Sequence, residues 1–490
     1  MRANERAPEG WAVRARQRRR LSQGILTVAV VAACIAGTGA IGVPAGFAST
    51  SSKDPHALGT STKLFVRVPD HGSAEQGVQL LRRGWESDAA ALARVDLTPQ
   101  AVWLTGGTAT QVRTAVEKTM AAAATERRTP VFVAYDIPGR DCGDYSAGGA
   151  LNTADYEAWI DGVAAGIGSA KAAVLVEPDS LGMLPGTDCG HGHGASRAGH
   201  PFTDVERYSQ LNYAVHVLEA KPHTSVYLDG TNSAWMGVSG IAKRLIHAGV
   251  NEAQGFFLNV SNYQYSENNT RFGTWVSECI ALLGRDSSAS CPGQYPNDGS
   301  DRTRSEALVG APQRGALDDY RPWKDGATGL ALDPRTIDDQ YASALRRAGV
   351  SATAHFVIDT SRAGAGPNPM KSYLRAPYKQ PAANVPKLES GNWCNSPGAG
   401  LGRTPTTNTG VPLVDAYLWV KTPGESDGQC NAAGAGRVWN YAAYSKPGWP
   451  KSVPGKASFD PLWGQVDPAA GAWFPAQMLD LIHHANPAIG

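Results

Sequence analysis

The chain of 490 residues carries 45 lysines and arginines against 44 aspartates and glutamates, a formal net charge of +1. This balance removes any general electrostatic reason to expect nucleic acid as a partner. Only 18% of the residues are charged, whereas glycine (55) and proline (32) are plentiful, so many polar but weakly charged loops must surround the core. Such loops suit a neutral substrate.

The first fifty residues have the features of an export signal. Residues 2–20 contain seven arginines, an apolar stretch runs from Ile25 to about Val43, and Gly46-Phe47-Ala48 offers small residues for cleavage. We therefore expect a secretory signal peptide over residues 1–48, a short extension over 49–62 and one catalytic domain over 63–490. An uncleaved membrane anchor is the alternative; after cleavage we expect a secreted protein with no membrane attachment.

Behind this leader, strand-like and helix-like segments alternate along the chain. We predict strands at 63–68, 101–104, 131–135, 173–177, 225–229, 255–260, 355–359 and 415–420, and helices at 111–124, 153–166, 204–218, 239–248 and 336–348. Strands separated by helices imply an α/β fold with a parallel sheet and right-handed crossovers. No Pro/Thr-rich or Gly/Ser-rich linker divides this region, so we expect a single domain.

Polar residues follow several of these strands. Asp141, Asp179, Asp229 and Asn262 each lie just beyond an apolar run. Ligands of parallel sheets and barrels bind at the carboxyl ends of the strands, so acids at two neighbouring ends can converge on one substrate bond. Each residue alone is as readily a loop residue or a helix cap. Their coincidence on one edge points to an enzyme, and paired carboxyls point to a glycosidase.

Two further features concern loops and cysteines. The irregular stretches 186–203, 285–332, 363–391 and 431–471 are too long for simple connections and are typical of lids, substrate walls or disorder. Of the seven cysteines, Cys34 lies in the leader, and an even number remains: Cys142, Cys189, Cys279, Cys291, Cys394 and Cys430. Six cysteines in an exported protein imply disulfides, but the residues alone leave the pairing open.

Five segments carry a resemblance to a known family. The run 133–149, which contains Arg140-Asp141-Cys142, and the run 175–181, which contains Glu177-Pro178-Asp179, resemble the two signature segments of the glycoside hydrolase family 6 cellulases. The segments 358–362, 391–395 and 419–428 agree as well. The resemblance extends over most of the chain after the leader.

The resemblance implies an inverting hydrolase of β-1,4-linked glucose chains, built on a distorted, partly open parallel β/α barrel. We separately expect no metal or cofactor, and a monomer. Asp179 would be the general acid, which needs a raised pKa to keep its proton. Asp141 would supply a neighbouring like charge, steady the oxocarbenium ion and help to relay a proton from water. Asp427 matches the candidate base. Inversion requires carboxyls roughly 6.5 to 9.5 Å apart.

The same resemblance implies the substrate-binding residues. Three tryptophans would stack glucose rings, Tyr135 would lie at the point of cleavage, and polar groups would hold sugar hydroxyls. The full set is Trp103, Tyr135, Asp229, Asn232, Trp235, Asn262, Trp393, Lys421 and Glu425. Core packing is the alternative for one of the tryptophans, and a solvated ion pair is the alternative for Lys421 with Glu425.

The family also suggests how the cysteines pair. It implies bridges from Cys142 to Cys189 and from Cys394 to Cys430, which leaves Cys279 with Cys291. Each of the first two bridges would pin a loop that carries a catalytic acid.

The chain departs from the family pattern in two places. Asn232 stands where the family usually has histidine, and Ala147 stands at the expected place of the serine that helps to hold the attacking water, with Ser146 beside it. Asn232 cannot carry charge, so a sugar contact could be weakened. A catalytically impaired β-glucan-binding protein is therefore a rival interpretation, although pure binding would not need three convergent acids.

Two other choices depend on short segments. Only Gly428 and Gln429 separate Asp427 from Cys430, which resembles the short form of open endoglucanases and favours internal attack. A chain-end-acting cellobiohydrolase is the alternative, because the insertions at 285–332 and 363–391 could roof the substrate. The histidines after Cys189, at 191, 193 and 200, suggest a metal site, but glycines separate them and the expected disulfide uses Cys189.

Overall fold

The computed structural model describes residues 56–143, 145–189, 196–197, 200–294, 334–430, 437–451 and 459–489. Contacts divide the chain into two units, residues 1–53 and 54–490, and all described residues belong to the second unit. The predicted leader, 1–48, and most of the insertion at 285–332 lie outside the described residues. Among the helices that are described, none combines the length and the apolar character needed to cross a membrane.

The centre of the fold is a curled half-barrel of seven parallel strands in the order β1-β2-β3-β6-β7-β8-β9. The strands are β1 (Val102–Leu104), β2 (Val131–Ala134), β3 (Ala172–Val176), β6 (Thr224–Asp229), β7 (Gly255–Leu258), β8 (His355–Asp359) and β9 (Val414–Leu418). The predicted partly open parallel β/α barrel is confirmed.

The two edges of the sheet approach each other without forming a ladder in the part of the chain that the structure describes. The backbone N–H of Ala101, just before β1, donates to the carbonyl of Trp419, just after β9, at 2.9 Å. The indole Nε1 of Trp103 donates to the carbonyl of Val420 at 2.8 Å. These bonds fix the β1 edge to the carboxyl end of β9 while leaving the barrel only partly closed.

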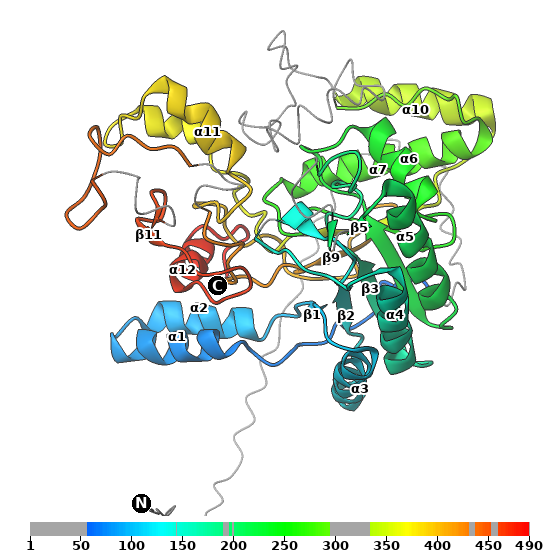
Figure 1. Cartoon of the computed structure of the whole chain (residues 1–490), viewed down its shortest axis with the longest axis horizontal. Helices are drawn as coiled ribbons and strands as arrows, with labels where there is room; N and C mark the ends of the chain where they lie inside the picture. The colour runs from blue at the N-terminus through cyan, green and yellow to red at the C-terminus, as the bar shows by residue number, and fades with distance from the viewer. Residues whose placement is uncertain are drawn as a thin grey trace, which may run out of the picture. The chain divides into compact units, whose positions relative to one another are not determined.

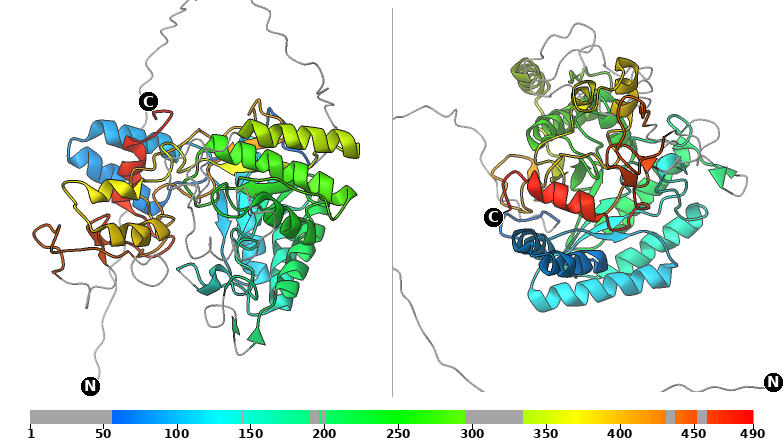
Figure 2. Two further views of the ribbon diagram at one scale, coloured as in Figure 1. Left: turned by 90° about the horizontal axis from the view of Figure 1, so that it is seen from above. Right: turned by 90° about the vertical axis from the view of Figure 1, so that its left-hand side faces the viewer.

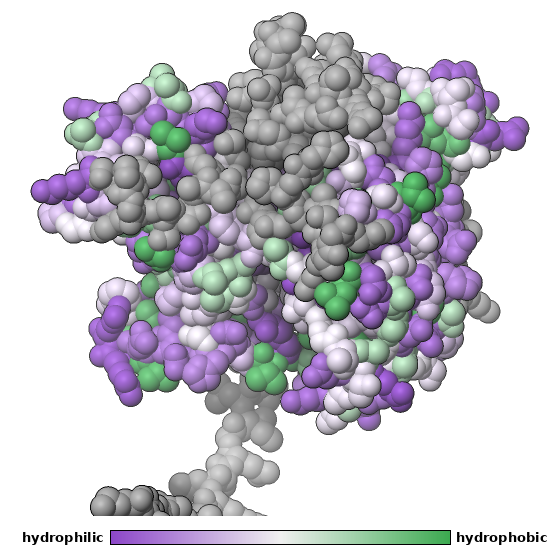
Figure 3. Space-filling model, viewed as in Figure 1, coloured by the Kyte–Doolittle hydropathy of each residue, from purple (hydrophilic) through white to green (hydrophobic). Residues whose placement is uncertain are grey.

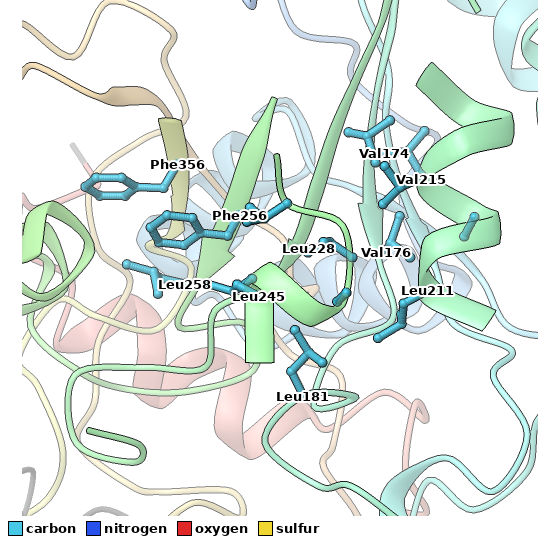
Figure 4. Close-up of a cluster of buried hydrophobic side chains, with 14 of the residues drawn as sticks. Val174, Val176, Leu181, Leu211, Val215, Leu228, Leu245, Phe256, Leu258 and Phe356 are labelled. Carbon is cyan, nitrogen blue, oxygen red and sulfur yellow. The ribbon is translucent and has the colours of Figure 1, made fainter. Parts of the chain in front are cut away.

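Both faces of the sheet are buried, as expected for parallel strands. On β3, Ala173 and Leu175 face the inside of the half-barrel and pack with Val133 of β2. Val174 and Val176 point the other way, toward Leu211 and Val215 of α5 (Asp204–Glu219), as Figure 4 shows. The alternation of side chains along each strand therefore produces an inner core and a larger outer core.

Helices cover the outer face of this sheet (Figure 1). Besides α5 they are α3 (Ala109–Glu126), α4 (Thr153–Ile167), α6 (Val238–His247), α7 (Ser266–Arg285) and α10 (Pro334–Ala348). Thr108 and Thr203 begin α3 and α5 with capping boxes, in which each threonine side chain accepts from the N3 amide. The five predicted helices are confirmed, and α7 was not predicted.

The predicted strand at 63–68 is wrong. The structure has only an isolated bridge between Leu64 and Thr129. Beyond it the side chain of Val68 is 83% exposed, Pro69 has no backbone N–H to donate, and Asp70 caps α1 (His71–Arg82). The chain therefore leaves the sheet after one bridge.

A second group of helices was also not predicted. α1, α2 (Glu86–Asp96) and α12 (Pro475–His483) contact one another and lie side by side (Figures 1 and 2). Leu80, Leu92 and Met478 form a separate core with Trp419. This core braces the segment after β9.

Short elements occupy the long loops. These are η1 (Asp141–Gly143), β4 (Ser196–Arg197), β5 (His200–Pro201), η2 (Met370–Leu374), η3 (Ala382–Asn384), α11 (Val385–Ser390), β10 (Phe459–Asp460) and β11 (Gln465–Val466). Met370, Leu388 and Trp439 form a small core, against which Tyr444 and Leu462 pack. On the face seen in Figure 3, hydrophilic side chains surround small, separate apolar patches.

Glycines allow α4 to pack closely on α3. A Cβ at Gly162 would overlap the carbonyl oxygen of Ala109, whereas a Cβ at Gly284 of α7 would meet nothing within 4 Å. We expect Gly162→Ala to lower the free energy of unfolding by about 1–3 kcal/mol because the helices must separate. The matched variant Gly284→Ala should raise it by up to about 1 kcal/mol. Urea unfolding measures both, and equal effects would contradict the close approach of α3 and α4.

Candidate active site

Asp141 and Asp179 leave neighbouring strands at the same edge of the sheet. β2 and β3 are paired in register up to Ala134 and Val176, and both acids follow within seven residues of these strand ends. Asp141 (φ 57°) and Asp179 (φ 66°) adopt left-handed backbone conformations, which cost about 1–3 kcal/mol for side chains other than glycine. Such strain is typical of residues whose position matters for function.

Glu177 holds the ends of these two strands together. Its fully buried carboxylate accepts from the backbone N–H groups of Asp136 and Ile137, each at 3.0 Å. Burial raises the pKa of Glu177 to about 8. The disulfide between Cys142 and Cys189 adds a covalent link between the loops that follow β2 and β3.

Asp179 is surrounded by other acids. Burial raises its pKa well above the ordinary value, and the negative charges of Asp229, Asp141 and Asp427 raise it further. A carboxyl in this setting keeps its proton near neutral pH, which is what a general acid requires. Tyr135 lies near the same acids. Burial, and then the charges of Asp141 and Asp179, raise the pKa of its hydroxyl.

Asp141 is oriented by the segment that follows it. Its Oδ2 accepts from the backbone N–H of Ser146 at 2.7 Å, and the Ser146 carbonyl accepts from Arg140 Nε at 2.9 Å. Ala147 is exposed at the surface. Ser146, which lies one residue before the position of the family's serine, thus supports Asp141 through its backbone.

Asp427 is a buried anion with several donors. Its Oδ2 accepts from Arg362 (2.7 Å), from the hydroxyl of Tyr263 (2.9 Å) and from the N–H of Asn395 (2.9 Å), while its Oδ1 lies 3.4 Å from Lys421 Nζ. Burial acts to raise the pKa of Asp427, but the charges of Arg362 and Lys421 and these hydrogen bonds hold it below its usual range. Asp427 therefore stays ionised.

Asp229 and Asn232, which we expect to contact sugar, are buried and expose 2% and 0% of their surface. Asp229 accepts from the N–H groups of Leu181 (3.2 Å), Gly182 (3.4 Å) and Thr231 (2.9 Å), and burial raises its pKa to about 6. Asn232 Oδ1 accepts from the N–H of Ala234 at 3.0 Å. In this conformation both residues support loops; Asp229 supports the one that follows Asp179.

The three tryptophans expected to stack glucose are each partly exposed. Trp103 meets Tyr135 edge to face at 5.5 Å between ring centroids. Trp235 packs over Gly182, where a Cβ would strike its ring. Trp393 lies beside the Cys394–Cys430 disulfide, with its ring centroid 6.2 Å from that of Tyr145. Their apolar faces thus lie next to the segments that carry the acids.

The three expected polar contacts are positioned by separate partners. Lys421 Nζ donates to the Ser426 carbonyl at 3.1 Å as well as facing Asp427. Glu425 Oε1 lies 3.6 Å from Arg67. Asn262 is 9% exposed and donates to the Val260 carbonyl at 3.3 Å. Lys421 and Glu425 are thus each paired with another charged residue.

Two supporting residues were missed although their motif was noted. Arg362 is fully buried between Asp427 and the ring of Tyr263, and its Nη2 donates to the Ser261 carbonyl. Asp359 accepts from backbone N–H groups on three strand ends, those of Ser261, Ser361, Val420 and Lys421. The signal available in the sequence was a pair of charged residues, Asp359 and Arg362, at the end of an apolar run.

The structure contains the two disulfides that the resemblance implies, Cys142–Cys189 and Cys394–Cys430, and the remaining pair, Cys279–Cys291. Cys189 is therefore no metal ligand, and residues 190–195 of the histidine-rich segment lie outside the described residues. Among the described residues, Cys430, Asp460 and Asp467 lie close enough together to be considered as metal ligands. The sulfur of Cys430 is in a disulfide, however, and Asp460 is bound to Arg437 at 2.6 Å. These donors do not suit a metal ion.

Comparisons with known proteins point to one family. The family described as Glycosyl hydrolases family 6 matches residues 60–485. Endoglucanase 1 of Streptomyces sp. (strain KSM-9) is 32% identical over 341 residues, which cover 68% of this chain and 66% of that protein. A probable 1,4-beta-D-glucan cellobiohydrolase C of Neosartorya fischeri is 28% identical over 375 residues, covering 73% and 62%. The chain thus spans less than two thirds of both relatives.

A solved structure is similar as well. The endoglucanase Cel6 of Mycobacterium tuberculosis, in complex with methyl-cellobiosyl-4-deoxy-4-thio-β-D-cellobioside, has a TM-score of 0.53 and 28% sequence identity. The match covers 88% of this chain and 99% of that one.

Removal of the buried cation beside Asp427 tests the electrostatics of the site. We expect Arg362→Met to cost about 3–5 kcal/mol in the free energy of unfolding, because it leaves a buried anion uncompensated. The matched variant Arg271→Met breaks an exposed pair with Asp338 of similar length, 2.6 Å, and should cost no more than about 1 kcal/mol. Denaturant unfolding gives both values, and a small cost for Arg362→Met would show that Asp427 is not held by it.

Proposed function

Since the chain belongs to glycosyl hydrolase family 6, we propose that it cleaves β-1,4-glucosidic bonds in cellulose or related β-glucans with inversion, by internal attack and as a secreted monomer. The observation that supports this most is the raised pKa of Asp179 beside the charges of Asp141 and Asp427. One neutral and two anionic carboxyls on one rim are what acid-assisted glycoside cleavage needs.

Asp179 donates its proton to the leaving oxygen in this proposal. Breaking the glycosidic bond builds negative charge on that oxygen and positive charge on the sugar ring. The buried, protonated carboxyl of Asp179 neutralises the negative charge on the oxygen, and the neighbouring anion of Asp141 stabilises the positive charge on the ring. Asp141 also helps to relay a proton away from the attacking water.

Asp427 remains the candidate base. Its lowered pKa keeps it in the ionised state that a base requires, but it also makes the carboxylate a weak proton acceptor. Asp427 Oδ2 already accepts from Arg362, Tyr263 and Asn395, whereas Oδ1 faces Lys421. Oδ1 is therefore the oxygen that would take the proton.

Glucose rings would lie against the exposed parts of Trp103, Trp235 and Trp393, since the C–H face of a sugar packs well on an indole. Tyr135 would contact the ring at the point of cleavage, and the polar groups of Asn262, Lys421 and Glu425 would bind hydroxyls. Asp229 and Asn232 would bind sugar as well; both are buried, and each also accepts a hydrogen bond from a loop N–H group.

Internal attack is favoured by the short segment after Asp427. The disulfide Cys394–Cys430 closes this segment only three residues beyond the acid, which limits how far it can extend over a bound chain. Relatives named endoglucanase and cellobiohydrolase both match the chain, so chain-end action is the second candidate. The three disulfides support an oxidising, extracellular location.

The experiment compares viscosity loss with the release of reducing ends on carboxymethylated cellulose. Internal attack lowers viscosity early, while few ends have formed. A proportionate fall would favour chain-end action. Binding without any new ends would favour the catalytically impaired β-glucan-binding protein and would overturn the proposed hydrolysis.

Asp179→Asn removes the proton donor while keeping the shape of the side chain. We expect turnover of β-glucan to fall at least about 1,000-fold, with the dissociation constant for a cello-oligosaccharide changed little. Asp161→Asn, an exposed site on α4, is the control and should behave like the wild type. Near-normal turnover by Asp179→Asn would show that the acid is misassigned.

Asp141→Asn removes a negative charge next to Asp179. Asp141 raises the pKa of Asp179, so its loss should lower that pKa and move the alkaline limb of the pH profile of kcat to lower pH. Turnover itself should fall strongly. The pH profile of kcat on a soluble glucan measures this, and an unmoved limb would mean that the two acids are not coupled.

A further inference from the structure

A buried arginine outside the known motifs contacts both loops that carry the paired acids. Arg207 lies on α5 and exposes 2% of its surface. Its Nη1 donates to the carbonyls of Ser180 (3.0 Å) and Met183 (3.4 Å), directly after Asp179. Its Nη2 donates to the carbonyl of Pro138 (3.0 Å), three residues before Asp141.

We propose that Arg207 is a positioning residue that fixes the separation between Asp141 and Asp179 by tying together the two loops that carry them. The inference rests on the proposed glycoside cleavage, in which these two acids act as a pair.

The fork of the guanidinium group explains why arginine occupies this place. Two nitrogens of one rigid plane point in different directions, so one side chain can bind carbonyls on two loops at once. A lysine ammonium carries all its N–H donors on one nitrogen, so it cannot span the two loops as two guanidinium nitrogens do. The buried carbonyls of both loops are satisfied by the same group, so a shift of either loop would break a bond in the interior.

The helix that carries Arg207 is itself fixed to the Asp179 loop. Asp204, in the first turn of α5, accepts from the N–H groups of Gly186 (2.7 Å) and Thr187 (3.2 Å). The bond from Arg207 to Pro138 therefore transmits the position of α5 and the Asp179 loop to the Asp141 loop. Glu177 makes a complementary tie, from the end of β3 to the N–H groups that follow β2.

The charges around Arg207 are compatible with this role. Burial lowers its pKa to about 10, and the acids Glu177 and Asp204 with the hydroxyls of Tyr156 and Tyr135 raise it. Arg207 therefore stays charged across the range in which the enzyme would work. Burial first, and then the charges of Asp229, Asp141 and Asp427, raise the pKa of Asp179.

Arg207→Lys keeps the charge and loses the fork. We expect kcat on a soluble β-glucan to fall about 10- to 100-fold with KM within about twofold, because small displacements of reacting groups are costly. As the acids move apart their repulsion weakens, so the alkaline limb of kcat should move to lower pH by about half a pH unit or more. A wild-type kcat and pH profile would overturn the proposal.

Arg244→Lys is the matched control. Arg244 lies on α6 and donates to the Leu181 carbonyl and to Asp188, each at 2.6 Å, so it braces the Asp179 loop without a bond to the Asp141 loop. It should move the pH profile much less than Arg207→Lys. Equal shifts would mean that general loop support, and not the link between loops, is what matters, which would overturn the proposal.

Amide hydrogen exchange tests the link independently of activity. In Arg207→Lys, peptides covering residues 136–143 and 179–184 should exchange faster than in the wild type, while β8 and β9 should not change. This comparison is valid even if the wild-type protein fails to cleave β-glucan, an outcome that would sink only the proposed function. If Arg207→Lys and Arg207→Gln both fail to fold by near-ultraviolet circular dichroism, Arg207 serves the whole fold and the positioning role is wrong.

Discussion

The structure depends on keeping several carboxyl groups close together in a buried site. Charges in such a place repel one another and lose hydration, so each must be compensated. Asp427 is compensated by Arg362 and Lys421, and Asp229 by three backbone N–H groups. Asp179, whose pKa rises most clearly from burial and like charge, is compensated by its own proton.

The parallel sheet makes this arrangement possible. Its strands end at one edge, so acids that are far apart in the chain arrive side by side. Buried polar side chains then bind the loops to each other: Asp359 joins the ends of β7, β8 and β9, Glu177 joins β2 to β3, and Arg207 reaches both acid-bearing loops. Most of these ties end on backbone atoms, which holds the geometry of loops that have no regular structure of their own.

Much of this could be predicted from the sequence, and the failures have physical reasons. Alternating apolar runs located seven strands, and long motifs located Asp141, Asp179 and Asp427. The run at 63–68 has the same apolar character, but Pro69 and the cap at Asp70 divert it from the sheet. The pattern of apolar residues alone does not show that a proline and a helix cap will end a strand early.

The supporting residues were harder to foresee because their partners are distant in the chain. Arg207 binds a carbonyl 69 residues away and Arg362 binds an acid 65 residues away, and no short pattern records such pairs. Resemblance predicts that Asp229 and Asn232 touch sugar, whereas their burial by the surrounding loops was not visible in the sequence. Burial is a property of the assembled fold.

The central claim is that Asp179 carries a proton at the pH where the enzyme works. Infrared difference spectra between the wild type and Asp179→Asn, recorded as pH rises, measure this directly. The account predicts the carbonyl stretch of a neutral carboxylic acid, assignable to Asp179, that persists at neutral pH. A side chain that ionises with the ordinary pKa of an aspartate would contradict it.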